Sequence, residues 1–308
     1  MAKASTPTVS IDIEVHELQQ IAQVLKGRLH LRGIVEGNLS GQHKSPRQGI
    51  SQDFAQHRDY VPGDDLKHLD WRAYAKSDRY VVKQYIEETN LRAFMVLDTS
   101  MSMNYQGTGL CKKGTYAAQL ASALTCALLN QSEAVGLVCF GNKIEHYLPA
   151  RSQGEQLGHI LRTIEGTTWQ DETDARKALL GLASRLPPKG VIFILTDGFD
   201  LDENSSSGYF AKLVGSIKKR GYQVIFLHVL DPSELEFPFD ELSLFEGLEG
   251  EDPIKIDPNG VRLAYLAELT AFREALESEA RAVGAKYCLC STGHSLKDNL
   301  LKLLENLI

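Results

Sequence analysis

Three short apolar runs occur in the middle of the chain, at residues 93–97, 191–195 and 223–229, and a fourth at 135–140. Between them lie segments whose apolar positions recur at helical spacing: 116–129, 156–164, 175–186 and 210–219. Strands that are apolar on both faces and alternate with helices are typical of a parallel sheet covered on both sides. The pattern therefore predicts an α/β fold, a doubly wound and mostly parallel sheet flanked by helices, as in Rossmann-like proteins.

The two ends of the chain follow other patterns. Residues 14–31 carry one apolar stripe at helical spacing, and residues 33–49 are rich in glycine, serine and basic residues, which indicates a loop or hairpin. Near the C-terminus we expect a helix at 261–283, a strand at 286–291 and an amphipathic helix at 295–307. We expect an N-terminal helical and loop extension over residues 1–90, and an α/β domain over residues 91–308.

Composition and charge narrow the classes of protein. Hydrophobic residues make up 43% of the 308 residues, which excludes a wholly disordered chain. The formal net charge is −7, which argues against nucleic acid as a partner, since phosphate binding needs a basic face. The excess of negative charge is concentrated in one segment. An acidic excursion near 232–257 holds nine acidic residues and only one lysine, Lys255.

No apolar run is long enough to span a bilayer, and the first residues lack the apolar core of a signal peptide. The five cysteines are odd in number and lie mostly in apolar runs, which favours reduced thiols over a disulfide framework. We therefore expect no membrane span and a cytoplasmic location.

Candidate chemistry begins where the first apolar run ends, at Asp98-Thr-Ser100-Met-Ser102. Alternate residues of an extended segment point the same way, so one carboxylate and two hydroxyls can converge. Hard oxygen donors suit Mg²⁺ or Mn²⁺. Asp197, which follows the run 191–195, can supply a second carboxylate. A threonine from a third loop would complete the set. Thr173 is the best candidate because it directly precedes a predicted helix, and Thr167 and Thr168 are the alternatives.

This constellation resembles the metal-ion-dependent adhesion site (MIDAS) of von Willebrand factor A domains. That site combines Asp-x-Ser-x-Ser, a loop threonine and an aspartate in a Thr-Asp-Gly turn, here Thr196-Asp197-Gly198. The resemblance implies that Ser100, Ser102 and Thr173 contact the metal directly or nearly so, and that Asp98 and Asp197 hold it directly or through water. The alternative is that these residues serve only as caps and turns.

The charge count indicates a binding site more than a catalytic one. Two carboxylates neutralise a divalent ion, which can then accept one more anionic oxygen from a partner's Asp or Glu. An aspartyl-phosphate phosphatase would need a second aspartate two positions after the nucleophile, where this chain has Ser100. We therefore expect that the protein is not an enzyme. The alternatives are a Mg²⁺-dependent hydrolase that uses the same aspartates, and a site that has become vestigial.

A second signature precedes the site. It comprises Arg58-x-Tyr-x-x-Gly-Asp-Asp65, then Asp70-Trp71, and a predicted strand that contains Lys83. By itself this stretch predicts a rigid corner, with Asp64 or Asp65 capping a short helix and Leu66, Leu69 and Trp71 packing that helix onto the sheet.

Together with the Asp98 motif, the stretch resembles the bacterial domain-of-unknown-function family fifty-eight, whose members are von Willebrand factor A-like. The resemblance covers about residues 40–235. It implies work beside a MoxR-type AAA+ ATPase, as chaperone-like or assembly machinery, with a client protein that offers a carboxylate to the metal.

Two other motifs have structural interpretations. Cys288, Cys290 and His294 lack the spacing and the second pair of a zinc site, and we expect the cysteines to share a core face. The glycine-rich segment 106–114 contains Lys112 and Lys113 but lacks P-loop spacing. We expect it to form a flexible loop at the rim of the site.

Overall fold

The structure is a computed structural model that describes residues 8–26, 28–29, 31, 54–61, 69–85, 91–169, 175–199, 209–245 and 253–307. The chain divides into two units, one formed by residues 1–38 and 91–308 and the other by residues 39–90. Each unit is described by itself.

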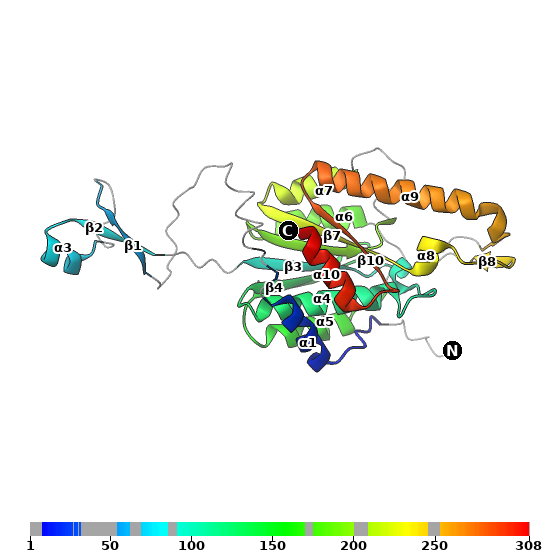
Figure 1. Cartoon of the computed structure of the whole chain (residues 1–308), viewed down its shortest axis with the longest axis horizontal. Helices are drawn as coiled ribbons and strands as arrows, with labels where there is room; N and C mark the ends of the chain where they lie inside the picture. The colour runs from blue at the N-terminus through cyan, green and yellow to red at the C-terminus, as the bar shows by residue number, and fades with distance from the viewer. Residues whose placement is uncertain are drawn as a thin grey trace. The chain divides into compact units, whose positions relative to one another are not determined.

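A six-stranded sheet forms the centre of the larger unit (Figure 1). Its strands, in chain order, are β3 (Arg92–Asp98), β4 (Ala134–Phe140), β5 (Ile144–Arg151), β6 (Gly190–Thr196), β7 (Tyr222–Leu230) and β10 (Lys286–Ser291). Their order across the sheet is β10-β7-β6-β3-β4-β5, and all neighbours are parallel except β4 and β5. This is the doubly wound order, in which the direction of winding reverses between β3 and β6. The predicted fold class is confirmed.

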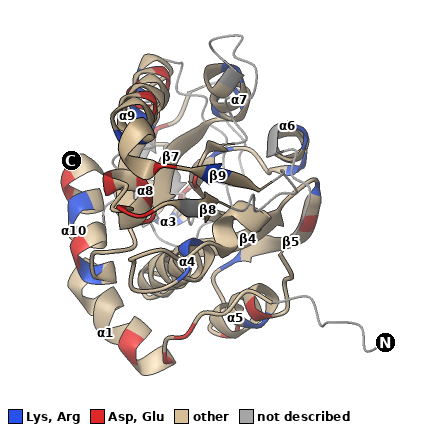
Figure 2. Ribbon diagram, turned by 90° about the vertical axis from the view of Figure 1, so that its right-hand side faces the viewer, with Lys and Arg blue, Asp and Glu red and all other residues tan. Residues whose placement is uncertain are grey.

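Helices cover both faces of the sheet, as Figures 1 and 2 show. One layer holds α1 (Val15–Leu25), α4 (Lys113–Leu129), α5 (Gln156–Glu165) and α10 (Leu296–Leu307). The other holds α6 (Ala175–Arg185), α7 (Tyr209–Lys218) and α9 (Pro258–Ala282). The described residues include no helix that is both long enough and apolar enough to cross a membrane.

Strand β3 shows why its sequence is apolar at every position. Ala93, Met95 and Leu97 belong to the core beneath α4, whereas Phe94 and Val96 belong to the core on the opposite face. All five are at most 1% exposed. Burial on both faces is what a central parallel strand requires. Strand β5 escaped prediction because its positions are half-buried or exposed and none is fully buried.

The N-terminal helix belongs to the larger unit, which differs from the predicted boundary at residue 90. Leu18, Ala22 and Leu25 of α1 are at most 1% exposed and belong to the core that includes α4. The apolar stripe that predicted this helix is therefore the reason that it packs with the α/β unit.

The smaller unit contains an antiparallel pair of strands, β1 (Phe54–Asp59) and β2 (Val81–Tyr85), and one helix, α3 (Trp71–Ser77). Asp70 caps α3 by accepting hydrogen bonds from the backbone N–H groups of residues 72 and 73. Asp64, Asp65 and Leu66 lie outside the described residues. Leu69 is buried and Trp71 is 61% exposed. The expected packing of these two side chains onto the sheet stays a prediction.

The acidic excursion carries short elements. It begins with α8 (Pro232–Glu236) and continues into the antiparallel pair β8 (Ser243–Phe245) and β9 (Ile254–Ile256). Asp231 and Glu234 form a capping box at the start of α8. The Asp231 carboxylate accepts a hydrogen bond from the Ser233 backbone N–H, and Glu234 Oε2 accepts one from the Asp231 backbone N–H.

Cys288 and Cys290 lie on β10, are each 1% exposed and belong to the core beneath α4. The cysteines are free, and the expectation of a shared core face is confirmed.

Candidate functional site

The Asp-x-Ser-x-Ser motif lies at the carboxyl end of β3. Asp98 is the last residue of the strand and is buried. Its Oδ1 accepts a hydrogen bond from the Ser100 backbone N–H at 2.9 Å, and its Oδ2 accepts one from the Thr196 hydroxyl at 2.5 Å. The hydroxyls of Ser100 and Ser102 lie 2.9 Å apart. The motif thus gathers three oxygen-bearing side chains at one strand end.

Asp197 directly follows β6, the strand beside β3, at the point where the winding of the sheet reverses. Ligands of open α/β sheets bind at such points. Burial, together with the charge of Asp197, raises the pKa of Asp98 to about 7, although hydrogen bonds from Thr196 and Ser100 work to lower it. The two carboxylates therefore lie close enough to interact electrostatically.

Of the five predicted site residues, the structure brings together Asp98, Ser100, Ser102 and Asp197. Thr173 lies outside the described residues. Of the alternatives, Thr167 donates its hydroxyl hydrogen to the backbone carbonyl of Thr163 at 2.7 Å, which commits it to the end of α5. Thr168 forms an isolated β-bridge with Thr8.

Thr196 is a site residue that the sequence interpretation missed. Its hydroxyl donates to Asp98 and accepts the backbone N–H of Gly198 at 3.0 Å. Gly198 has a φ of +75°, a conformation that glycine adopts without strain. The Thr-Asp-Gly turn therefore both presents Asp197 and fixes the orientation of Asp98.

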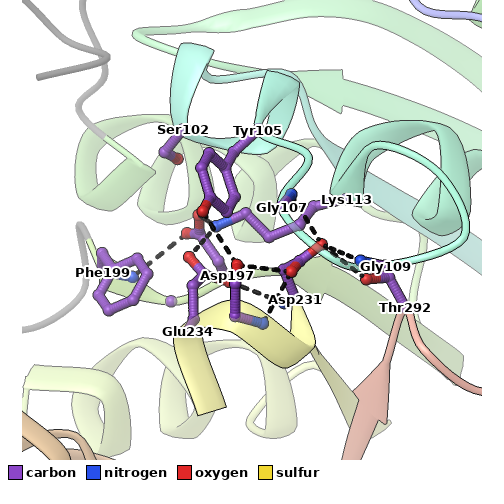
Figure 3. Close-up of polar contacts among 12 residues, drawn as sticks. Ser102, Tyr105, Gly107, Gly109, Lys113, Asp197, Phe199, Asp231, Glu234 and Thr292 are labelled. Atoms are coloured by element: carbon purple, nitrogen blue, oxygen red, sulfur yellow. Dashed lines mark hydrogen bonds and ion pairs between the residues drawn. The ribbon is translucent and has the colours of Figure 1, made fainter. Parts of the chain in front are cut away.

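Lys113, the first residue of α4, is a second missed residue (Figure 3). Its Nζ lies 2.9 Å from Asp197 Oδ2 and 2.6 Å from Glu234 Oε1, and the side chain is 1% exposed. The sequence offered no signal for this pairing, because the three residues lie on α4, after β6 and on α8.

The glycine-rich loop between the motif and α4 is anchored, contrary to the expected flexible rim. The backbone N–H groups of Gly107 and Gly109 each donate to Asp231 Oδ2 at 3.1 Å, and that of Thr108 donates to Asp231 Oδ1 at 3.0 Å. The Thr292 hydroxyl also donates to Asp231 Oδ2. Figure 3 shows Asp231 between the loop, α8 and the end of β10. One buried carboxylate thus ties three segments together beside the site.

His228 holds the Thr-Asp-Gly turn through the backbone of Asp197. Its Nε2 lies 2.7 Å from the Asp197 backbone oxygen, and its Nδ1 lies 2.7 Å from the Tyr287 hydroxyl. A carbonyl oxygen can only accept, so Nε2 carries the proton and Nδ1 accepts from Tyr287. Burial lowers the pKa of His228 to about 4, so the ring is neutral at physiological pH.

The donor chemistry of the site fits a hard divalent cation. Two carboxylates and two hydroxyls are oxygen donors of the kind that Mg²⁺ takes while it keeps several waters. Among the described residues, no three His, Cys, Asp or Glu side chains are grouped to hold a metal ion. The serine hydroxyls are therefore needed for a ligand set here. The ammonium of Lys113 on Asp197 shows that this carboxylate already accepts a cation.

Comparisons with known proteins place the chain among uncharacterised relatives. The family model described as "Protein of unknown function DUF58" matches residues 56–275. Uncharacterized proteins of Mycobacterium bovis and Mycobacterium tuberculosis are each 27% identical over 231 residues, which covers 74% of this chain and 69% of each relative.

Three solved structures are also similar. They are an aerotolerance-related membrane protein from Bacteroides fragilis (19% identity, 70% of this chain and 99% of that chain, TM-score 0.46), the SpRpn10 VWA domain (11%, 69% and 94%, 0.37) and an uncharacterized membrane spanning protein from Vibrio fischeri (16%, 70% and 96%, 0.25). Two of the three are named as membrane proteins, which contradicts the cytoplasmic location expected from the sequence. That expectation rested on the absence of a long apolar run, which does not determine where a protein resides. We therefore withdraw the expectation of a cytoplasmic location.

Proposed function

The chain belongs to the DUF58 family and has a von Willebrand factor A-like fold, and from that premise we propose that it is a metal-dependent protein-binding module. Asp98, Ser100, Ser102 and Asp197 would hold Mg²⁺ or Mn²⁺, with Thr173 as the expected ligand from a third loop. The observation that carries the proposal is the convergence of two buried carboxylates and two serine hydroxyls where the winding of the sheet reverses.

The charges of these ligands favour a partner that offers a carboxylate. Asp98 and Asp197 together balance a divalent ion, while the hydroxyls add no charge. Such an ion is an electrophile that can take one more anionic oxygen from a partner protein. Ser102 is partly exposed, whereas Asp98, Ser100 and Asp197 are buried, so Ser102 marks the side from which a partner's side chain approaches.

The titratable side chains around the site have structural roles, which supports binding over hydrolysis. Both ring nitrogens of His228 are engaged, and its lowered pKa keeps it from taking a proton at neutral pH. Lys113 is enclosed by two carboxylates. A general base must reach the proton that it abstracts, and neither group is free to do so.

The family resemblance supplies the proposed partner, a MoxR-type AAA+ ATPase, with which the chain would act in chaperone-like or assembly work on a client protein.

A binding measurement tests the proposal. The full chain is immobilised, and a MoxR-type ATPase encoded in the same genome is passed over it without nucleotide, in 5 mM Mg²⁺ (about the level that saturates a weak site) and then in EDTA. We expect capture by the wild type in Mg²⁺ and loss of capture in EDTA. Asp98→Asn serves as the matched control, since any effect of Mg²⁺ on the ATPase itself is the same for both chains.

Equal capture by wild type and Asp98→Asn in Mg²⁺ contradicts the proposal. A panel of phosphate esters checks the competing function. Mg²⁺-dependent turnover that disappears in a folded Asp98→Asn variant would establish a hydrolase instead.

A further inference from the structure

A buried lysine lies next to the proposed metal ligands. Lys113 Nζ contacts Asp197 Oδ2 and Glu234 Oε1 at 2.9 and 2.6 Å, and it lies 5.6 and 5.3 Å from the ring centroids of Tyr105 and Phe199. Figure 3 shows the ammonium pointing between the two carboxylates with both rings alongside. Lysine is almost never fully buried unless it is paired, so this arrangement depends on the two carboxylates.

The ammonium keeps its charge in this position. Its Nζ contacts a carboxylate oxygen of Asp197 and another of Glu234, and opposite charges at such distances favour the charged form of the ammonium. The site therefore contains a permanent cation supplied by the chain itself. A divalent ion that binds Asp197 has to share that carboxylate with the ammonium.

Glu234 gives the ammonium a second partner. Burial raises the pKa of Glu234 even though the Lys113 ammonium works to lower it, and its Oε2 accepts the Asp231 backbone N–H at 2.7 Å. Glu234 is therefore fixed at the start of α8 while its other oxygen faces Lys113. A lysine that loses part of its interaction with Asp197 still has Glu234 within contact.

We infer that Lys113 is a resident counter-cation that competes with the divalent ion for Asp197. In the metal-free protein it neutralises the buried carboxylates, so the site stays folded without metal. When metal binds, the ammonium shifts its interaction toward Glu234. This competition sets the affinity for the divalent ion. The inference rests on the proposed metal site.

Three variants of the full chain separate this role from a purely structural ion pair. Lys113→Met keeps the length and apolar character of the side chain and removes its charge. Glu234→Gln keeps the shape of its side chain and leaves Asp197 as the ammonium's remaining carboxylate. The double variant Lys113→Met/Glu234→Gln removes the competing cation while it keeps the summed charge of Lys113, Asp197 and Glu234 at the wild-type value.

The probes are Mn²⁺ and Mg²⁺ alone, with affinity measured by calorimetry and stability by thermal unfolding with and without metal. Lys113→Met should bind Mn²⁺ at least about tenfold more tightly than wild type, because a like charge next to the ion has been removed. Without metal it should unfold at a lower temperature, and metal should restore more of that loss than it adds to wild type. Glu234→Gln should bind about threefold or more weakly, and the double variant should fall between wild type and Lys113→Met.

The outcomes distinguish a failure of the role of Lys113 from a failure of the metal site. If the wild type binds metal and folded Lys113→Met binds it equally or more weakly, the role of Lys113 is overturned while the metal site stands. If Lys113→Met does not fold, Glu234→Gln decides, and an unchanged affinity overturns the inference. If no protein in the set binds Mn²⁺ at millimolar concentration, the metal site of the proposed function fails, and the role of Lys113 with it.

Discussion

The side chain of Lys113 reaches Asp197 with an Nζ–Oδ2 distance of 2.9 Å, although the two residues lie 84 positions apart. The contact joins the start of α4 to the turn after β6, so a helix end and a strand end are held together by one buried ion pair. Removing one partner of such a pair destabilises a protein strongly, because the other charge is left buried and uncompensated. The predictions below concern the groups around this pair.

Asp231→Asn should destabilise the larger unit. The wild-type carboxylate accepts backbone hydrogen bonds from Gly107, Thr108 and Gly109, and its pKa is lowered because the hydrogen bonds from Ser233 and the glycines outweigh the effect of burial. An amide places N–H groups against these donors. We expect a loss of about 2–3 kcal/mol in the free energy of unfolding, measured in urea.

The matched control is Asp240→Asn. The Asp240 side chain is 81% exposed and pairs with Arg262 at the surface. Its replacement should change stability by less than about 0.5 kcal/mol. A similar loss in the two variants contradicts the anchoring role of Asp231.

Gly190→Ala should also destabilise the sheet. A Cβ at this first position of β6 would lie 2.2 Å from the backbone oxygen of Arg92, which cannot move without disturbing β3. We expect a loss of about 2–3 kcal/mol from overpacking, measured by thermal or urea unfolding.

Gly181→Ala is the natural comparison. Gly181 lies within α6, where an added Cβ meets nothing within 4 Å. Alanine should stabilise this helix by about 0.5–1 kcal/mol, because glycine loses more backbone entropy on folding. Destabilisation at Gly181, or tolerance at Gly190, is inconsistent with the described packing of α6 or of β6 against β3.

His228 should contribute a pH dependence to stability. Its pKa is about 4 in the folded protein and 6.5 in the unfolded chain, so below pH 6.5 the unfolded state binds the additional proton. Stability from this group is complete above pH 6.5 and falls as the pH decreases toward 4, by roughly 3 kcal/mol in all.

Asp98 contributes the opposite pH dependence of stability. Its pKa is raised from 3.8 to about 7, so between these pH values the folded protein holds a proton that the unfolded chain loses. The test is therefore the difference between wild type and His228→Gln, in which glutamine keeps a donor for the Asp197 carbonyl and an acceptor for Tyr287. The stability of wild type relative to His228→Gln should decline from pH 6.5 to pH 4. A constant difference across this range contradicts a buried neutral histidine.

The sheet and the motif were predictable because each depends on local sequence. Continuous apolar runs identified β3, β4, β6 and β7, and the strand ends placed Asp98 and Asp197 at one edge. Strand β5 was not predictable in this way, since none of its positions is fully buried and it leaves no apolar run.

The environment of the site was not predictable, because it arises from tertiary contacts between distant segments. Lys113 reads as an ordinary surface lysine in a glycine-rich loop, yet it is enclosed because α8 and the turn after β6 each bring a carboxylate to it. The same loop reads as flexible because its glycines are visible in the sequence, whereas its anchor, Asp231, lies more than a hundred residues away.

Ser100→Ala should weaken metal binding only modestly, by about threefold, because water can replace a neutral hydroxyl ligand. The Ser100 hydroxyl lies 2.9 Å from that of Ser102, and we expect both hydroxyls to be ligands of the same ion. Calorimetric titration with Mg²⁺ measures the change. A loss as large as that caused by removing a carboxylate contradicts the charge argument for this site.

Titration of the full chain with Mn²⁺, compared between wild type and Asp98→Asn, tests the central claim most directly. Asparagine keeps an acceptor for the Ser100 N–H and removes one of the two negative charges, and circular dichroism confirms that the variant is folded. We predict one bound ion in the wild type and an affinity at least about tenfold weaker in Asp98→Asn. Equal affinity in the two proteins, or no binding to the wild type at millimolar Mn²⁺, would contradict a metal-dependent module.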